Sequence, residues 1–379
     1  MHARVQYGAI EWDSLSRAIG CIALILAPFA MLMAWPSAFS PYMEGKTVVF
    51  RALSAIWSTS MLATLAIKPR MAPNAVWLYG FFALILGLAD LAPVYSREFS
   101  FWGDPARQEG FIAIASYLSY FMALTLLPEG ERVWKWIIGG WAISGVIMAL
   151  ASCIQLLNEI TTYQPVIRAY GLIGNPVLFG DFLALTIIFT IWAARRSELW
   201  LAWTLAAGLQ GAVLLTTATR SAMAGLLAGM FFLIPGRSKW LAAGAGIIGI
   251  LLYNSQWHNT LSFDMAHRVD CAGKYLTYIG QHPLLGWGQD NLKVMCAPEV
   301  FDRAHNWALQ VLGDGGALAL GAYLAFLAGA LKSVVFQPFA LAIFAAYILM
   351  VTIEPDAITT TVPMLTALGW ANRKYRAAY

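Results

Sequence analysis

The sequence predicts an all-α polytopic membrane protein, and two observations carry this prediction. Hydrophobic residues make up 60% of the 379 residues, and charged residues only 12%. Apolar runs of about 17–25 residues recur along the chain, and runs of this length can cross a hydrocarbon core of about 30 Å. Because every backbone polar group in lipid needs an internal partner, such runs are expected to be helices. Residues 1–379 are therefore expected to form one integral membrane domain, without a separate soluble domain.

About twelve transmembrane helices are expected from these runs. The first run lacks a small-residue cleavage site and is long enough to span, so it is expected to remain as a signal anchor. The basic residues are scattered at predicted helix ends, and a net charge of +4 gives no basic patch for nucleic acid. The predicted spans are 16–35, 47–66, 75–94, 110–127, 134–156, 175–194, 198–216, 221–235, 239–254, 305–330, 333–351 and 356–371.

The connections between these spans alternate in character, which predicts their orientation. Short basic connections, such as 68–70, 195–196 and 237–239, alternate with longer mixed ones. Short basic loops stay in the cytoplasm, whereas long loops can be exported despite positive charge. Both termini are therefore expected inside, and the longest polar stretch, 255–304, is expected outside as one large loop.

This polar stretch is the most informative part of the sequence. It contains or borders four of the five histidines, which are His258, His267, His282 and His305. It also holds Cys271 and Cys296, for which two interpretations stay open. A disulfide between them would close a loop of roughly 25 residues and stabilise the fold by roughly 3 kcal/mol; otherwise they are two free thiols. Neither has the close-spaced partners of a zinc site, so no metal is expected.

Two arginines are expected at the outer membrane face, and each has two interpretations. Arg220 follows Thr216-Thr217-Ala218-Thr219 at the start of a predicted span, where the positive end of the helix repels a cation. It either extends to lipid phosphate or clamps a phosphate ligand through its planar guanidinium group. Arg168 precedes Gly174-Asn175-Pro176, a loop that begins a helix with Asn as cap and Pro at the first position. It is either an interface anchor or a second phosphate ligand.

His305 begins the predicted span 305–330 and is followed by Asn306. A lone histidine at an interface is most often a loop or capping residue, but an imidazole is also the natural general base near neutral pH. His282 is the alternative base, although the glycines that follow it indicate loop architecture. Trp287 and Trp307 flank these histidines; they could stack on sugar rings, but an ordinary interfacial belt of aromatic residues explains them better.

These residues together resemble the superfamily of O-antigen ligases and O-antigen polymerases. The resemblance covers roughly 165–330 by motif and the whole chain by topology. The motifs are Arg-x-Tyr-Gly-Leu-Ile-Gly-Asn-Pro at 168–176, Phe-Gly at 179–180, Thr-Arg-Ser at 219–221, His-Pro-Leu-Leu-Gly-Trp-Gly at 282–288, and His-Asn at 305–306 with ten residues to Gly316. Each motif alone is weak, and their order and spacing carry the resemblance.

The resemblance implies a glycosyltransferase of the bacterial inner membrane with a GT-C-like helical fold. Its donor would be a glycan on undecaprenyl diphosphate, and its active site would face the periplasm. Arg168 and Arg220 would hold the diphosphate, His305 would deprotonate the acceptor hydroxyl, and Asn306 and His282 would support the site. The reaction would invert the anomeric carbon without metal or other cofactor. The acceptor, a growing glycan or the lipid A core, stays open, and so does the choice between ligase and polymerase.

Two other functions compete with this one. A transporter or flippase for an anionic lipid-linked substrate would place ionisable residues near the bilayer midplane on broken helices. The sequence shows few ionisable residues in mid-span and no half-to-half repeat, which disfavours transport. A non-catalytic scaffold would leave Arg168, Arg220 and His305 dispensable.

Overall fold

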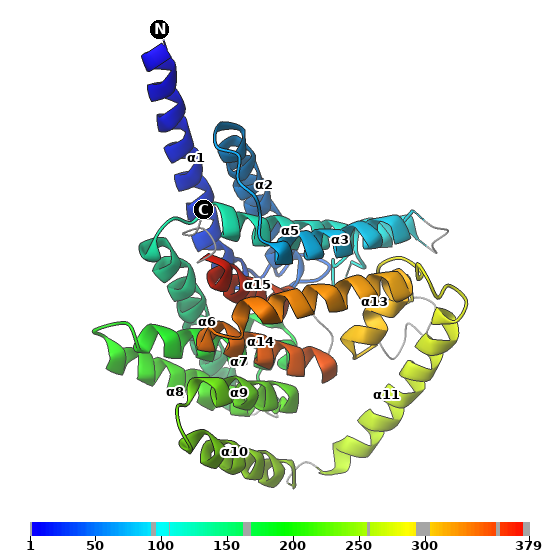
Figure 1. Cartoon of the computed structure of the whole chain (residues 1–379). Coiled ribbons are helices and arrows are strands. Elements are labelled where there is room, and N and C mark those ends of the chain that lie inside the picture. The colour runs from blue at the N-terminus through cyan, green and yellow to red at the C-terminus, as the bar shows by residue number, and fades with distance from the viewer. Residues whose placement is uncertain are drawn as a thin grey trace.

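The computed structural model describes residues 2–91, 96–105, 107–161, 168–255, 258–292, 304–353 and 357–373. This part of the chain is helical and contains no strand, as predicted (Figure 1). Each predicted span overlaps one helix. The helices are α1 (His2–Ala30), α2 (Glu44–Ile67), α3 (Asn74–Ala89), α4 (Arg97–Trp102), α5 (Phe111–Leu126), α6 (Glu131–Thr161), η1 (Gly171–Ile173), α7 (Pro176–Ala194), α8 (Trp200–Thr216), α9 (Arg220–Leu233), α10 (Ser238–Ser255), α11 (His258–Ile279), α13 (Trp307–Val334), α14 (Pro338–Ile353) and α15 (Ile358–Asn372).

Five of these helices are long and apolar enough to cross a membrane, so the protein is membrane-embedded. They lie in α1, α2, α6, α7 and α13. The other apolar helices in the described residues have 10–17 residues. Since an α-helix rises 1.5 Å per residue, a 16-residue helix extends only about 24 Å, less than the hydrocarbon core of about 30 Å. Length and composition therefore support five crossings directly, fewer than the twelve that the sequence predicts.

Two helices form the centre of the bundle. α7 is apolar on every face, and most of its side chains are buried, as expected for a helix with neighbours all round. In α15, every residue from Ile358 to Asn372 is buried, including three successive threonines. The buried hydroxyl of Thr366 contacts both Tyr120 of α5, at 2.7 Å, and Trp141 of α6, at 3.0 Å. These contacts join α15 to the helices around it.

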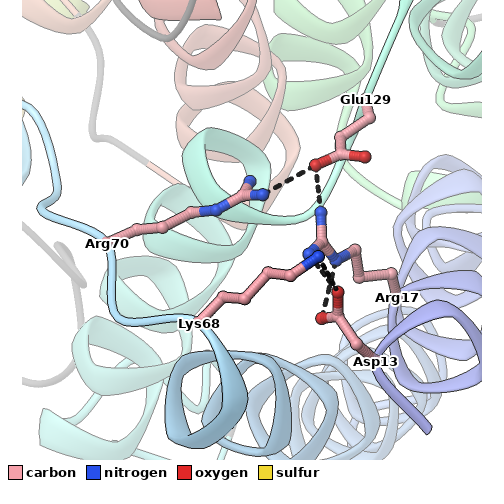
Figure 2. Close-up of polar contacts among 5 residues, drawn as sticks. All are labelled: Asp13, Arg17, Lys68, Arg70 and Glu129. Atoms are coloured by element: carbon pink, nitrogen blue, oxygen red, sulfur yellow. Dashed lines mark hydrogen bonds and ion pairs between the residues drawn. The ribbon is translucent and has the colours of Figure 1, made fainter. Parts of the chain in front are cut away.

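Ion pairs mark one end of the bundle, which we call the Asp13 end. Figure 2 shows Arg17 of α1 between Asp13 and Glu129, with Arg70 also on Glu129 and Lys68 on Asp13. These pairs bring together α1, the segment after α2 and the α5–α6 connection. Further pairs join Glu131, at the start of α6, to the ends of α7 and α15 through Arg196 and Arg373.

The opposite end, which we call the His305 end, is held by hydrogen bonds to the backbone. Asp90, which follows α3, accepts a bond from the Gln289 N–H at 3.0 Å. Glu109, which precedes α5, accepts one from the N–H of Ile358 at the start of α15, at 3.1 Å. Segments far apart in the chain therefore meet at this end.

The polar stretch 255–304 is not a simple loop, because it contains the 22-residue helix α11. In Figure 1, α11 runs along one edge of the view between α10 and the start of α13. Its last turns form a small apolar cluster with the segments that follow, built on Cys271, Tyr275, Ile279, Leu292 and Ala304. Cys271 is buried there, while Cys296 lies outside the described residues, so the disulfide stays a prediction.

Candidate functional site

Arg168 forms hydrogen bonds to the connection between α8 and α9. Its Nε donates to the Thr217 carbonyl at 2.6 Å, and one terminal nitrogen donates to the Ala218 carbonyl and the Thr219 hydroxyl, at 3.4 and 3.2 Å. Carbonyls at the end of a helix lack intrahelical donors, so a guanidinium group is a suitable cap for them. Arg168 thereby fixes the turn that leads into Arg220.

The segment around Arg168 is itself fixed by a residue that sequence reasoning missed. Lys46 of α2 is fully buried, and its Nζ donates to the carbonyls of Met33, Tyr42 and Leu172 at 2.7, 2.6 and 2.6 Å. All three N–H groups of the ammonium therefore have acceptors. The only sequence signal for this role was a charged residue just before the predicted span 47–66. An ordinary lysine at the membrane interface would give the same signal.

The motif at 168–176 has a local structural basis in addition. The Asn175 side chain accepts bonds from the Val177 and Leu178 N–H groups, so it caps α7 as predicted. Gly174 has a φ of 77°, and a Cβ there would lie 2.2 Å from the ring of Tyr42. Burial raises the pKa of the nearby Tyr170 hydroxyl, and Tyr42 and Glu159 raise it further, so this phenol stays protonated at neutral pH.

Arg220 is the first residue of α9 and is half-buried. Among the residues that the structure describes, its side chain forms no hydrogen bond or ion pair. The start of a helix carries partial positive charge, so α9 gives the guanidinium group no compensation. The next side chain, Ser221, contacts Asp181 of α7 at 3.3 Å, which ties the first turn of α9 to the bundle centre.

Packing of α9 against α14 brings Arg220 to the His305 end. The two helices run antiparallel: a Cβ on Gly225 would meet Met350, and one on Gly229 would meet the Ala342 carbonyl. The first turn of α9 therefore lies beside the last turn of α14. That turn also receives the Asn306 amide, which donates to the Thr352 carbonyl at 3.0 Å. The end of α14 is thus a common neighbour of the Arg220 and His305 segments.

His305 is half-buried and has a φ of 51°, in the left-handed region that non-glycine residues seldom occupy. Asn306 follows as the cap of α13, because its side chain accepts bonds from the Ala308 and Leu309 N–H groups at 2.9 and 3.1 Å. Asn306 therefore supports the site through the backbone, by fixing where α13 begins and how the chain turns into it.

His282, the alternative base, belongs to a turn. Its ring packs edge-on against Trp287, with the centroids 4.1 Å apart, and its carbonyl accepts the Gly286 N–H. The Trp287 indole in turn donates to the Tyr278 carbonyl at 2.9 Å. These contacts explain why His282 and Trp287 occur together, and they assign both residues to the architecture of the 282–288 segment.

The same segment inserts into a break in α13, where the sequence predicts an uninterrupted span. Gly316 has a φ of 66° and a ψ of −166°, which is not helical. The Ala317 and Leu318 N–H groups, which would bond the carbonyls of Gly313 and Asp314 in a regular helix, donate instead to Pro283 and Leu284. The carbonyls of Gly313 and Asp314 accept the N–H groups of Trp287 and Gly288 instead, at 2.8 and 2.9 Å. Two helix bonds are exchanged for four bonds to the loop.

This exchange requires two glycines in contact with backbone. A Cβ on Gly286 would lie 2.5 Å from the Gly313 carbonyl oxygen, and one on Gly316 would lie 2.3 Å from the Leu284 carbonyl. The motif at 282–288 and the spacing to Gly316 thus describe one structural unit. Irregular backbone at membrane depth is tolerated where protein surrounds it in this way. A broken helix is also a feature that many transporters have at their binding sites.

Unusual backbone gathers at the His305 end. In the described part of the chain, the non-glycine residues with positive φ are Gln108, Ala218, Asp290 and His305. All four lie in connections at this end; Ala218 comes two residues before Arg220, and His305 is itself a predicted site residue. Strained conformations concentrate at functional sites, because the surrounding structure has to maintain them.

The predicted site residues thus share one end of the bundle, and the contacts join them in two groups. Arg168 and Arg220 lie on either side of one turn, while His305, Asn306 and the 282–288 segment surround the start and the break of α13. Within the described ranges, no group of three or more His, Cys, Asp or Glu side chains is placed to hold a metal ion. No protein-family model matches the chain, and no curated protein matches it.

Proposed function

We propose that the protein transfers a glycan from undecaprenyl diphosphate to a hydroxyl acceptor at the His305 end. The observation that carries the proposal is the half-buried Arg220 that lacks a partner among the described residues, at the same end as His305. A half-buried guanidinium group with no acid paired to it among the described residues favours an anionic ligand, and a diphosphate can accept two parallel bonds from it. The resemblance of the motifs supplies the identity of the donor.

The two arginines have different tasks in this proposal. Arg220 binds the diphosphate directly. Arg168 donates hydrogen bonds to the turn that precedes Arg220, so it positions that turn and adds positive charge beside the ligand. Charge that develops on the leaving diphosphate is stabilised by these fixed cations, which need not reorganise during the reaction.

His305 acts as the general base. Its imidazole takes the proton from the acceptor hydroxyl as the oxygen attacks the anomeric carbon, while the bond from that carbon to the diphosphate oxygen breaks. Undecaprenyl diphosphate leaves with the electron pair, and the anomeric configuration inverts. The left-handed backbone at His305 and the Asn306 cap fix the position from which the ring reaches the acceptor.

The fold and location proposed with this function go beyond the five long helices. All twelve predicted spans would cross a bacterial inner membrane, the shorter ones where the bilayer thins locally, in a GT-C-like arrangement. The Asp13 end would face the cytoplasm and the His305 end the periplasm. A phosphatase fused after Gln281 should then be active, and one fused after Tyr379 inactive; the reverse pattern would overturn the orientation.

A deletion strain tests the function. Loss of the O-antigen ladder from lipopolysaccharide, with the polymer accumulating on undecaprenyl diphosphate, would identify a ligase. Shortening of the ladder to a single repeat unit, or loss of an exopolysaccharide, would identify a polymerase. Unchanged surface polysaccharides of every class would contradict both.

The broken α13 supports transport of an anionic lipid-linked substrate as a second candidate. Transporters often bind substrate at interrupted helices, and Asp314 lies within two residues of the break at Gly316. Proteoliposomes separate the two functions. A transporter moves the intact lipid-linked glycan between leaflets, whereas a transferase cleaves it only when an acceptor is present.

A further inference from the structure

A cavity of about 90 Å³ lies at the His305 end, separate from the two arginines. It is bounded by α3, α5, α13 and the start of α15. Because one water molecule needs about 10–15 Å³ of such space, the cavity has room for roughly six. That space suits part of one sugar unit or another small polar group. The polar and aromatic residues in its wall include Glu109, Tyr117, Gln289, Trp307, Gln310 and Asp314.

The decisive residue in the wall is Gln289. Its side chain is only 3% exposed, and neither the amide nitrogen nor the amide oxygen has a hydrogen-bond partner among the described residues. The backbone of this residue is held firmly, because its N–H donates to Asp90 and its carbonyl accepts the Asn291 amide at 3.0 Å. A buried amide with both groups unpaired is costly to the fold, and here it lines the cavity.

The loop that inserts into the break of α13 positions the polar residues that line the cavity. The loop bonded into the break ends at Gly288, which places Gln289 directly after it. Asp314, whose carbonyl accepts the Gly288 N–H, accepts bonds from the Gln310 amide at 3.1 and 3.0 Å through its two carboxylate oxygens. Glu109 is oriented by the Ile358 N–H. The polar groups of the cavity therefore have fixed positions before any ligand binds.

We propose that this cavity binds a hydroxyl-bearing ring of a sugar. An unpaired amide offers one group that donates and one that accepts, and hydroxyl groups do both. The carboxylates of Glu109 and Asp314 add acceptors for further hydroxyls, and Trp307 and Tyr117 offer flat faces for the apolar side of a ring. An organic cation fits less well. It could bind the side-chain oxygen of Gln289, but the N–H groups of the same side-chain amide would repel it. Because Trp307 and Gln310 belong to the first turn of α13 after His305, the ring is assigned to the acceptor; this assignment rests on the proposed function.

Sugar binding to the purified full-length protein in detergent tests the proposal. The probes are glucose, galactose and N-acetylglucosamine, followed by saturation-transfer NMR and by thermal unfolding. The test variant is Gln289→Leu, and the matched control is Gln281→Leu, which alters an exposed glutamine eight residues earlier. Wild type and the control should bind at least one sugar and unfold at a higher temperature in its presence.

The Gln289→Leu variant should bind that sugar about tenfold more weakly or not at all, as expected when one hydrogen-bonding group is lost. Without sugar, it should unfold at the wild-type temperature or above, because the substitution removes an unpaired buried amide. A lower unfolding temperature together with unchanged sugar binding would assign the amide to structure and overturn the proposal. Absence of binding of all three sugars to wild type would also overturn it, as would binding of tetramethylammonium in their place.

The result separates this proposal from the proposed function. If the protein binds a sugar through Gln289 but never transfers glycan, the cavity assignment stands and the glycosyltransferase is wrong. If Gln289→Leu transfers glycan and binds the sugar as wild type does, the cavity assignment is wrong and the glycosyltransferase stands.

Discussion

The contacts of charged side chains differ between the two ends of the bundle. At the Asp13 end, cations and acids pair with one another, as Arg17 does with Asp13 and Glu129 (Figure 2). At the His305 end, the cations Lys46, Arg51 and Arg168 donate to backbone carbonyls instead. A cation paired with an acid is neutralised locally, whereas carbonyl acceptors supply no opposite charge.

The acids at the His305 end are also occupied by backbone. Asp90, Glu109 and Asp290 accept the N–H groups of Gln289, Ile358 and Asp104, respectively. These contacts join the acids to backbone N–H groups rather than to cations. We propose from this difference in contacts that the His305 end is the one that binds ligand.

Substitution of His305 should have the largest effect on activity. Loss of a general base in His305→Ala should slow glycan transfer by about 10²–10⁴-fold, while binding of the lipid-linked donor is retained because the arginines are intact. His282→Ala, which removes a ring packed on Trp287, is the control and should lose less activity. Transfer by His305→Ala at the wild-type rate would remove His305 from the mechanism.

Paired substitutions of arginine compare the ends directly. Arg220→Ala should reduce transfer by about 10²–10³-fold, the range for loss of one transition-state donor, and should weaken donor binding. Arg70→Ala removes the same charge from the Asp13 end, where Arg70 pairs with Glu129, and should leave the transfer rate unchanged. Equal effects of the two variants would mean that net charge matters rather than position.

Lys46 tests how much a buried side-chain donor at the His305 end contributes to stability. Lys46→Met leaves three carbonyls without their donor, at about 1–3 kcal/mol each. We expect a loss of about 3 kcal/mol or more in the free energy of unfolding, measured by thermal or denaturant unfolding in detergent. Lys332→Met, at an exposed lysine, is the control, and a similarly small effect of both substitutions would contradict the buried role.

The smallest effect is expected at the Asp13 end. Glu129 contacts both Arg17 and Arg70, but its side chain is 57% exposed. Solvent screening limits exposed pairs to about 1 kcal/mol or less, so Glu129→Gln should change stability by no more than this and should leave transfer intact. A loss of transfer in this variant would show that the two ends are coupled.

The long apolar runs predicted the helices, because burial in lipid leaves few alternatives to a helix. The break at Gly316 was not predicted, since three nearby glycines fit close helix packing as well as a helix interruption. Its partner, the 282–288 segment, was recognised as a motif without the reason for it, which is backbone contact between Gly286 and Gly313.

At the site, the predicted topology placed Arg168, Arg220 and His305 on one face, and the contacts bring them to one end of the bundle; their functional roles stay predictions. Sequence could not separate the arginine that caps α8 from the one without a described partner, because that difference depends on which carbonyls lie within reach. Gln289 was missed because an amide after a glycine turn resembles any loop residue. Only the three-dimensional arrangement places it in the wall of the cavity.

Sealed proteoliposomes that contain an undecaprenyl-diphosphate glycan test the central claim, that the His305 end catalyses glycan transfer. The measurement is release of undecaprenyl diphosphate on addition of acceptor, with and without EDTA. We predict acceptor-dependent release by wild type, unchanged by EDTA and lost in His305→Ala and Arg220→Ala. Movement of the intact lipid-linked glycan between leaflets, without any release of undecaprenyl diphosphate, would contradict the claim and establish a transporter instead.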